Sequence, residues 1–267
     1  MTTAQPSHST ESGMLAAFAH IFRAGLAGVI AGALFLGIGA RLVMRLLAAV
    51  NPEARGLTTD NGNTIGDITA SGTVELVVFI GIAGGAIAGI IWIATREFLP
   101  AGSRMRLLLG TVIATSFGGS VLIQEDNLDF FLLDPAEASI PLFLALMALC
   151  GGTTILLDRF LEPILPTGDT VNAIYGGLSG LAGIFALPTL FGSLFLEDGC
   201  GCSNPPWPTG VLLLALIGLA GVSLWRHFSG GTGARENNRL TLAGRAALAG
   251  VFLVSTIDLG TAVNEIL

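Results

Sequence analysis

Apolar residues occur along this chain in long runs that are separated by short polar loops. Seven of these runs are long and apolar enough, or nearly so, to cross a bilayer as helices, since a hydrocarbon core about 30 Å thick needs roughly 20 apolar residues. They cover residues 21–50, 74–94, 107–123, 139–157, 171–196, 209–225 and 240–263. The pattern predicts an all-α, polytopic transmembrane helix bundle with about seven spans.

Two of these expected spans contain a residue that can kink a helix or that is costly in a bilayer. Pro188 lies inside the run 171–196, where the missing backbone N–H predicts a kink. The run 240–263 is the least apolar, with Arg245 near its start and Asp258 well inside it. An ionised side chain within a span is costly, so Asp258 is expected to have a partner, to be protonated or to face water.

The polar segments give a domain division and an orientation. Residues 1–13 are polar and lack the basic start of a signal peptide, so we expect a disordered tail before one helix-bundle domain, 14–267. Three arginines lie in the loop 95–106 and four lie in or beside the loop 226–245, whereas the loops 124–138 and 197–208 contain acids and no base. The positive-inside rule then predicts a cytoplasmic N-terminus and an outside C-terminus.

Composition supports the membrane assignment. The chain is 52% hydrophobic and 12% charged, which is outside the range of soluble domains. We therefore expect a protein of the cell membrane, the inner or plasma membrane of a bacterium, with the lipid bilayer as its surroundings. The net charge of -7 argues against nucleic acid as a partner.

Arg41 and Arg45 lie one helical turn apart at the expected outer end of the first span, against the positive-inside trend. One interpretation is that both arginines extend to lipid headgroups. The other is that they meet acids at the same depth. We expect Arg41 to pair with Asp258, and Arg45 to face Glu265, Glu75 or lipid phosphate.

Glycine is abundant, with 37 residues, and several glycines recur at helical spacing. Small residues at this spacing let helices approach closely in a membrane, so these positions are expected to pack against neighbouring helices or a second copy of the chain. The residues are Gly81, Gly85, Gly89, Gly176, Gly180 and Gly183.

The three cysteines fall into two groups. Cys150 lies in an expected span and is interpreted as a packing residue. Cys200 and Cys202 lie in an expected outer loop, where a redox-active link, a bridge between chains, a metal site or ordinary thiols all remain open. Two cysteines supply half of a tetrahedral site, and no histidine is nearby in the sequence.

The absence of certain residues and motifs excludes several classes of membrane protein. Retinal needs a lysine for its Schiff base and the chain has none, so a retinal protein is excluded. Haem held by two histidines within the bilayer is not expected either, because His8, His20 and His227 lie in the tail or at span borders. No cofactor is predicted. No nucleotide-binding or zinc-protease motif is present, and the sequence favours a role other than that of an enzyme.

Two hypotheses from different classes follow. In the first, the bundle moves a small solute, an anion or protons through a polar site that includes Arg41, Arg45 and Asp258. In the second, the protein is a non-catalytic accessory or assembly subunit, and its glycine-rich helix faces bind membrane-complex partners or a second copy of the chain.

Overall fold

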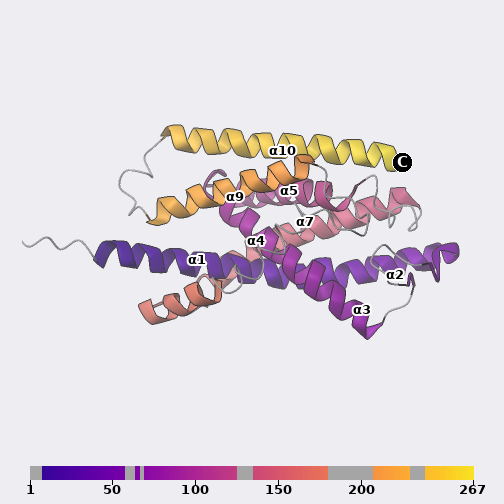
Figure 1. The fold of residues 1–267 in the computed structure, drawn as a ribbon, viewed down its shortest axis with the longest axis horizontal. Helices are drawn as coiled ribbons and strands as arrows, with labels where there is room; N and C mark the ends of the chain where they lie inside the picture. Colours follow the sequence, from indigo (N-terminus) through magenta and orange to yellow (C-terminus); the bar gives the residue numbers. More distant parts are fainter. Residues whose placement is uncertain (1–7, 58–63, 67–68, 125–134, 180–206, 229–237) are drawn as a thin grey trace, which may run out of the picture.

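The computed structural model describes residues 8–57, 64–66, 69–124, 135–179, 207–228 and 238–267. This part of the chain is helical and contains no β-strand. The long helices form a bundle elongated in one direction, and the start of α1 and the C-terminus lie at its opposite ends (Figure 1). Below, the end of the bundle where α1 begins is called the inner end, following the orientation expected from the sequence.

Two long helical rods form the first part of the bundle, and each changes its helical geometry midway. In each rod a seven-residue π-helical segment separates two α-helical parts. The first rod consists of α1 (His8–Gly32), η1 (Ala33–Gly39) and α2 (Ala40–Val50). The second rod consists of α3 (Ala70–Glu75), η3 (Leu76–Ile82) and α4 (Ala83–Thr95). The two π-helical segments contact each other.

The remaining helices pack around these rods. They are α5 (Ser103–Leu122), α7 (Ala136–Leu161), α9 (Trp207–Phe228) and α10 (Asn238–Ile266), and residues 169–179 are also helical. A short 3-10 helix, η2 (Pro52–Ala54), follows α2. In α7, Pro141 lies in the second turn and cannot donate a backbone hydrogen bond to the carbonyl oxygen of Glu137, yet the helix continues through it.

Five helices are long and apolar enough to cross a membrane, and they correspond to five of the seven expected spans. They are Ala16–Val50, Ala70–Thr95, Ser103–Leu122, Ala136–Leu161 and Arg239–Ile266. The sixth expected span corresponds to the shorter apolar helix Gly210–Arg226. Most of the remaining one, from residue 180 onward and including Pro188, lies outside the described residues. An all-helical membrane protein is thus supported, while the number of seven spans stays a prediction.

The α1 helix packs against α4 and α7. Its contact with α4 is made by the backbones, because a Cβ added to Gly28 would overlap the carbonyl oxygen of Gly85, and one added to Gly32 would overlap that of Gly81. A Cβ at Gly89 would lie 2.7 Å from the carbonyl oxygen of Ala24. The stripe of Gly81, Gly85 and Gly89 therefore lies directly against α1.

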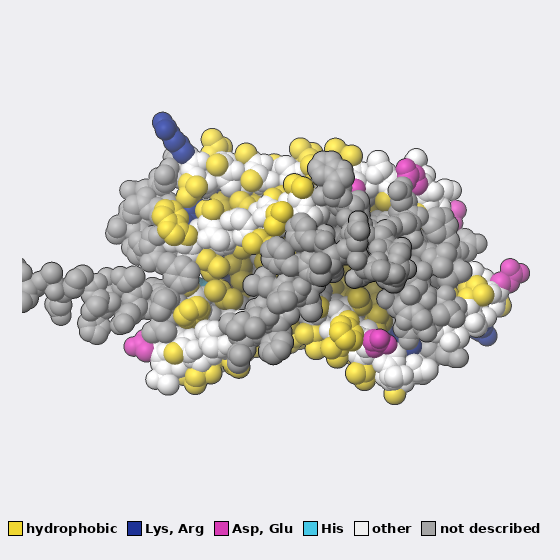
Figure 2. All heavy atoms as spheres, viewed as in Figure 1, with side chains coloured by type: hydrophobic (Ala, Val, Ile, Leu, Met, Phe, Trp, Pro, Cys, Tyr) yellow, Lys and Arg dark blue, Asp and Glu magenta, His cyan; other side chains and the backbone are white. Residues whose placement is uncertain are grey.

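The α10 helix is the most peripheral of the five long spans. Only 17% of its span is buried, against 33% to 44% for the others, and it packs against α5 and α9. Large apolar side chains on its other side are exposed, including Leu242, Leu253 and Ile257. Figure 2 shows apolar side chains along much of the visible length of the bundle, as expected for a surface that meets lipid tails.

Candidate functional site

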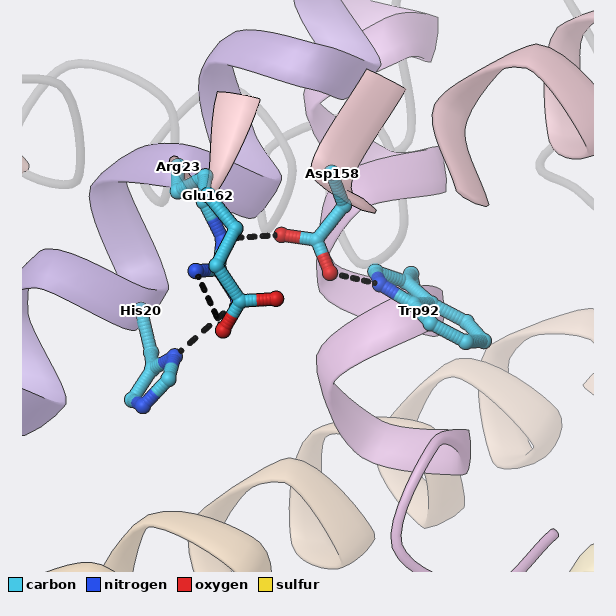
Figure 3. A network of polar contacts seen from close by, with 5 residues as sticks. All are labelled: His20, Arg23, Trp92, Asp158 and Glu162. Carbon is cyan, nitrogen blue, oxygen red and sulfur yellow. Dashed lines mark hydrogen bonds and ion pairs between the residues drawn. The ribbon is translucent and has the colours of Figure 1, made fainter. Parts of the chain in front are cut away.

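A buried ion pair joins the second half of α1 to the inner ends of α4 and α7. Arg23 of α1 donates from Nε to Oδ1 of Asp158 on α7 at 2.7 Å, and the indole Nε1 of Trp92 on α4 donates to Oδ2 of the same carboxylate at 2.7 Å (Figure 3). The side chains of Arg23 and Asp158 are only 11% and 5% exposed. Both oxygens of a buried carboxylate therefore accept a hydrogen bond, as a charge with little access to water requires.

Two further side chains extend this network toward the surface. Arg23 also contacts Glu162, with 3.1 Å between Nη1 and Oε1, and the Glu162 side chain is 61% exposed. One turn back along α1, the Nη2 of Arg23 lies 3.3 Å from Nδ1 of His20 (Figure 3). Because a guanidinium can only donate, this contact requires Nδ1 of His20 to be without a proton.

Arg96 follows the end of α4 and adds a second guanidinium to this region. Burial lowers the pKa of Arg96, and the nearby Asp158 carboxylate opposes that shift, with Glu97 adding to the opposition. An arginine keeps its charge despite such a shift, because its ordinary pKa is far above neutrality. Asp158 thus experiences the field of two arginines, one bonded directly and one at longer range.

This arrangement holds helices in place, because each oxygen of the Asp158 carboxylate accepts a hydrogen bond from a different helix. Its direct bonds connect α1, α4 and α7, and each charged partner is compensated. Within the described ranges there is no group of three or more histidine, cysteine, aspartate or glutamate side chains that could hold a metal ion. The network can fix the positions of these three helices.

The outer cluster expected from the sequence is dispersed in the structure. Arg41 is buried in α2 with 8% of its surface exposed, while Arg45 is exposed. Asp258 and Glu265 lie on α10, which packs on the α5 and α9 side of the bundle, whereas α2 packs on α7. No ion pair between described residues joins either arginine to these acids or to Glu75. The structure therefore does not bring Arg41 and Asp258 together.

Glu75 is the member of the expected cluster that borders a surface hollow. It lies at the end of α3 and lines an open groove of about 600 Å³, whose other lining residues are Ala70, Ser71, Val74, Val78 and Phe79. Apolar walls predominate in this groove, and its position on the outside of the bundle exposes it to lipid or solvent.

The remaining expected site residues are placed only in part. Gly176 lies against the ring of Phe18, because a Cβ added there would be 2.7 Å from a ring carbon. Cys150 is a buried free thiol in α7. Gly180, Gly183, Cys200 and Cys202 lie outside the described residues, so the alternatives for the two loop cysteines stay as the sequence leaves them.

Sequence reasoning missed the network at the inner end. Arg23 and Asp158 both lie at the cytoplasmic borders of their expected spans, so matching acids and arginines by depth there could have found the pair. That comparison is informative only for helices that touch, and the contact between α1 and α7 is not evident from the sequence. Comparison of the chain with protein-family models, curated proteins and solved structures finds no match.

Proposed function

We propose that the protein is a non-catalytic subunit of a membrane assembly, and that it binds a transmembrane partner helix through the exposed face of α10. The observation that carries this proposal is the position of Asp258. This aspartate lies within the span Arg239–Ile266, on the helix with the smallest buried share. Its carboxylate forms no ion pair with the described residues.

An aspartate in such a position is costly for an isolated subunit. Insertion of an aspartate near the middle of a span costs about 2.5 to 3.5 kcal/mol, and a basic residue at the same depth on a neighbouring helix reduces that cost. Because α5 and α9 offer no such residue to Asp258 in the described part of the chain, the partner is expected to be a transmembrane helix with an arginine or lysine at that depth.

The exposed side of α10, beside the half-buried Asp258, has space for a close neighbour. A Cβ added to Gly250 or Gly260 would meet nothing within 4 Å, in contrast to the glycines between α1 and α4. Ala246 and Ala247, one turn before Gly250, are also exposed. Small exposed residues in a bilayer allow another helix to approach and gain van der Waals contact.

The interior of the bundle fits a scaffold. The α1 and α4 backbones touch at their glycines, and the buried ion pair connects α1 to the inner ends of α4 and α7. Close-packed interiors resist deformation, so this part of the molecule is suited to presenting a fixed surface to a partner.

The size of the complex extracted from native membranes in a mild detergent tests this function. The wild-type chain of 27.4 kDa is expected in a particle larger than its monomer, whose measured composition includes a partner helix with a basic residue. Asp258→Asn and Gly250→Leu should each release the monomer. Gly177→Leu is the matched control, because Gly177 is equally open but lies on the helix 169–179.

Two results would overturn the assembly role. One is a wild-type chain that is extracted as a monomer under conditions that preserve other membrane complexes. The other is an Asp258→Asn particle with the same mass and composition as the wild type, since the aspartate would then contribute nothing to binding.

A second candidate function, passage of a small solute, an anion or protons, is favoured by one specific observation. The π-helical segments η1 and η3 touch midway along the two rods, and the buried Arg41 lies on α2 immediately after η1. Such segments are frequent at functional sites. Reconstituted wild-type protein should then support a flux that Arg41→Gln reduces. A wild-type flux no greater than that of protein-free vesicles rejects this candidate.

A further inference from the structure

Three arginines lie where α5 begins and α7 ends, and none of them takes part in the ion pairs of Arg23. Arg159 of α7 donates from Nη1 to the hydroxyl of Ser103 at 2.7 Å and from Nη2 to the carbonyl oxygen of Ser103 at 3.1 Å. Arg106 of α5 donates from Nε to the carbonyl oxygen of Pro100 at 3.2 Å. Arg104 lies in the same first turn of α5 and is exposed.

The charges of this arginine cluster, Arg104, Arg106 and Arg159, are not compensated by acids. The oxygens that hold Arg106 and Arg159 belong to carbonyl and hydroxyl groups, and no described acid forms an ion pair with any of the three. The first turn of α5 also contains no acidic residue. Because each guanidinium has five N–H donors, the bonds already made leave donors available for an anion.

Exposed apolar side chains follow the cluster on both helices. Met105 and Leu108 of α5 are 49% and 59% exposed, and Leu156 and Phe160 of α7 are 51% and 63% exposed. The two helices pack against each other, so these side chains border one contact between neighbouring helices. A ligand that fits this surface has an anionic head and an apolar body.

We propose that the arginine cluster binds the phosphate headgroup of an anionic phospholipid, whose acyl chains lie along the exposed side chains of α5 and α7. A zwitterionic lipid has a phosphate as well, but its cationic group cancels the attraction. Each basic residue near an anionic membrane surface strengthens binding about fivefold, and a guanidinium can hold phosphate oxygens through two parallel hydrogen bonds. This inference concerns a different surface from α10 and does not depend on the assembly role.

Native mass spectrometry of the full-length protein tests the proposal. Equal concentrations of phosphatidylglycerol and phosphatidylcholine are added in detergent, and the adducts that contain one lipid are counted. The wild type should prefer phosphatidylglycerol at least tenfold. The triple variant Arg104→Gln, Arg106→Gln, Arg159→Gln should bind both lipids equally, while Arg104→Gln alone should lower the preference about fivefold. Arg55→Gln, which removes an exposed arginine that follows η2 at the other end of the bundle, should keep the wild-type ratio.

Three results would overturn the proposed lipid site. A wild type without preference, or a triple variant that retains it, overturns the lipid site. Displacement of phosphatidylglycerol by inorganic phosphate at constant ionic strength also overturns it, because the cluster would then bind a free anion. If the triple variant does not fold, as shown by loss of its melting transition, Arg104→Gln decides the question, since Arg104 is exposed and makes no bond that the fold needs.

Discussion

At the scale of single residues, Asp158 is a buried acid whose charge depends on neighbouring side chains for stabilisation. It accepts one bond from Arg23 and one from Trp92, both at 2.7 Å, and only 4% of the residue is exposed. A buried ion pair is weak evidence for stability by itself, because desolvation offsets much of the attraction. Removal of Asp158 is a different matter, because the buried guanidinium of Arg23 would then have only the exposed Glu162 as a charged partner among the described residues.

Asp158→Asn is therefore expected to lower the free energy of unfolding by about 3 kcal/mol, measured from thermal or denaturant unfolding in detergent. Glu162→Gln removes the exposed contact of the same arginine and should cost less than about 1 kcal/mol. The double variant Arg23→Gln with Asp158→Asn should recover part of the loss, because the charge of Arg23 is then no longer buried beside a neutral side chain. If Asp158→Asn and Glu162→Gln lower the free energy of unfolding equally, the network is solvated and does not hold the three helices together.

The positions of Arg41 and Arg23 in the structure show which features of a site can be predicted from the sequence. The depth of a residue follows from its position along a helix, and by this measure Arg41 and Asp258 are compatible. The neighbours of a helix depend on side-chain packing in three dimensions. In the structure α10 contacts α5 and α9, so two residues at similar depth lie on different sides of the bundle. Arg23 and Asp158 meet because α1 and α7 do pack together.

At the scale of elements, the contact between α1 and α4 depends on the absence of side chains at particular glycines. Gly25 and Gly28 lie three residues apart on α1, yet a Cβ at Gly25 would meet nothing within 4 Å, whereas one at Gly28 would lie 2.8 Å from the backbone nitrogen of Gly89 and overlap Gly85. The pair is a matched test of backbone contact on one helix.

Gly28→Ala should destabilise the protein by about 1 to 3 kcal/mol, because the added methyl group forces the backbones apart. Gly25→Ala should change the stability by less than about 1 kcal/mol, through helix propensity alone. Melting temperatures in the same detergent compare the two. If both alanine variants melt with the wild type, the close approach of α1 and α4 is not present in the folded protein.

The π-helical segments are the elements that the sequence did not predict. The stretches ALFLGIG and LVVFIGI have the same apolar composition as the α-helical residues beside them. Hydropathy and helix propensity therefore give no sign of the change in hydrogen-bond register. The structure places the two segments against each other, and in that contact a Cβ at Gly37 would lie 2.9 Å from Val77. We therefore attribute the π-helical geometry to the packing of the two rods against each other, which the local sequence pattern does not reveal.

At the scale of the whole molecule, the length and hydropathy of the runs predicted a polytopic helix bundle, because the bilayer thickness sets the length of a spanning helix. The span 240–263, the least apolar one, corresponds to one of the five long apolar helices of the structure, Arg239–Ile266. The orientation of the bundle depends on charges in the loops and on the membrane during insertion. The fold alone therefore does not determine which end faces the cytoplasm.

Fusions to a reporter enzyme that is active only outside the cytoplasm test this orientation. Fusions after Asp129 and after Asn204 should be active, and fusions after Gly102 and after Gly231 should be silent, since arginines hold the latter loops inside. Membrane-impermeant thiol reagents provide an independent control. An active fusion at Gly231 together with a silent one at Asn204 would reverse the orientation.

The assembly role is tested most directly by photocrosslinking in native membranes. A photoreactive amino acid is placed at Ile257 on α10, or at Leu42 on α2 and Leu108 on α5, which are 66%, 61% and 59% exposed. If the assembly role holds, Ile257 should crosslink to one transmembrane peptide with an arginine or lysine within a turn of the attachment point, and Leu42 and Leu108 should give lipid adducts. Lipid adducts alone at all three positions, or a partner peptide without a basic residue, would contradict it.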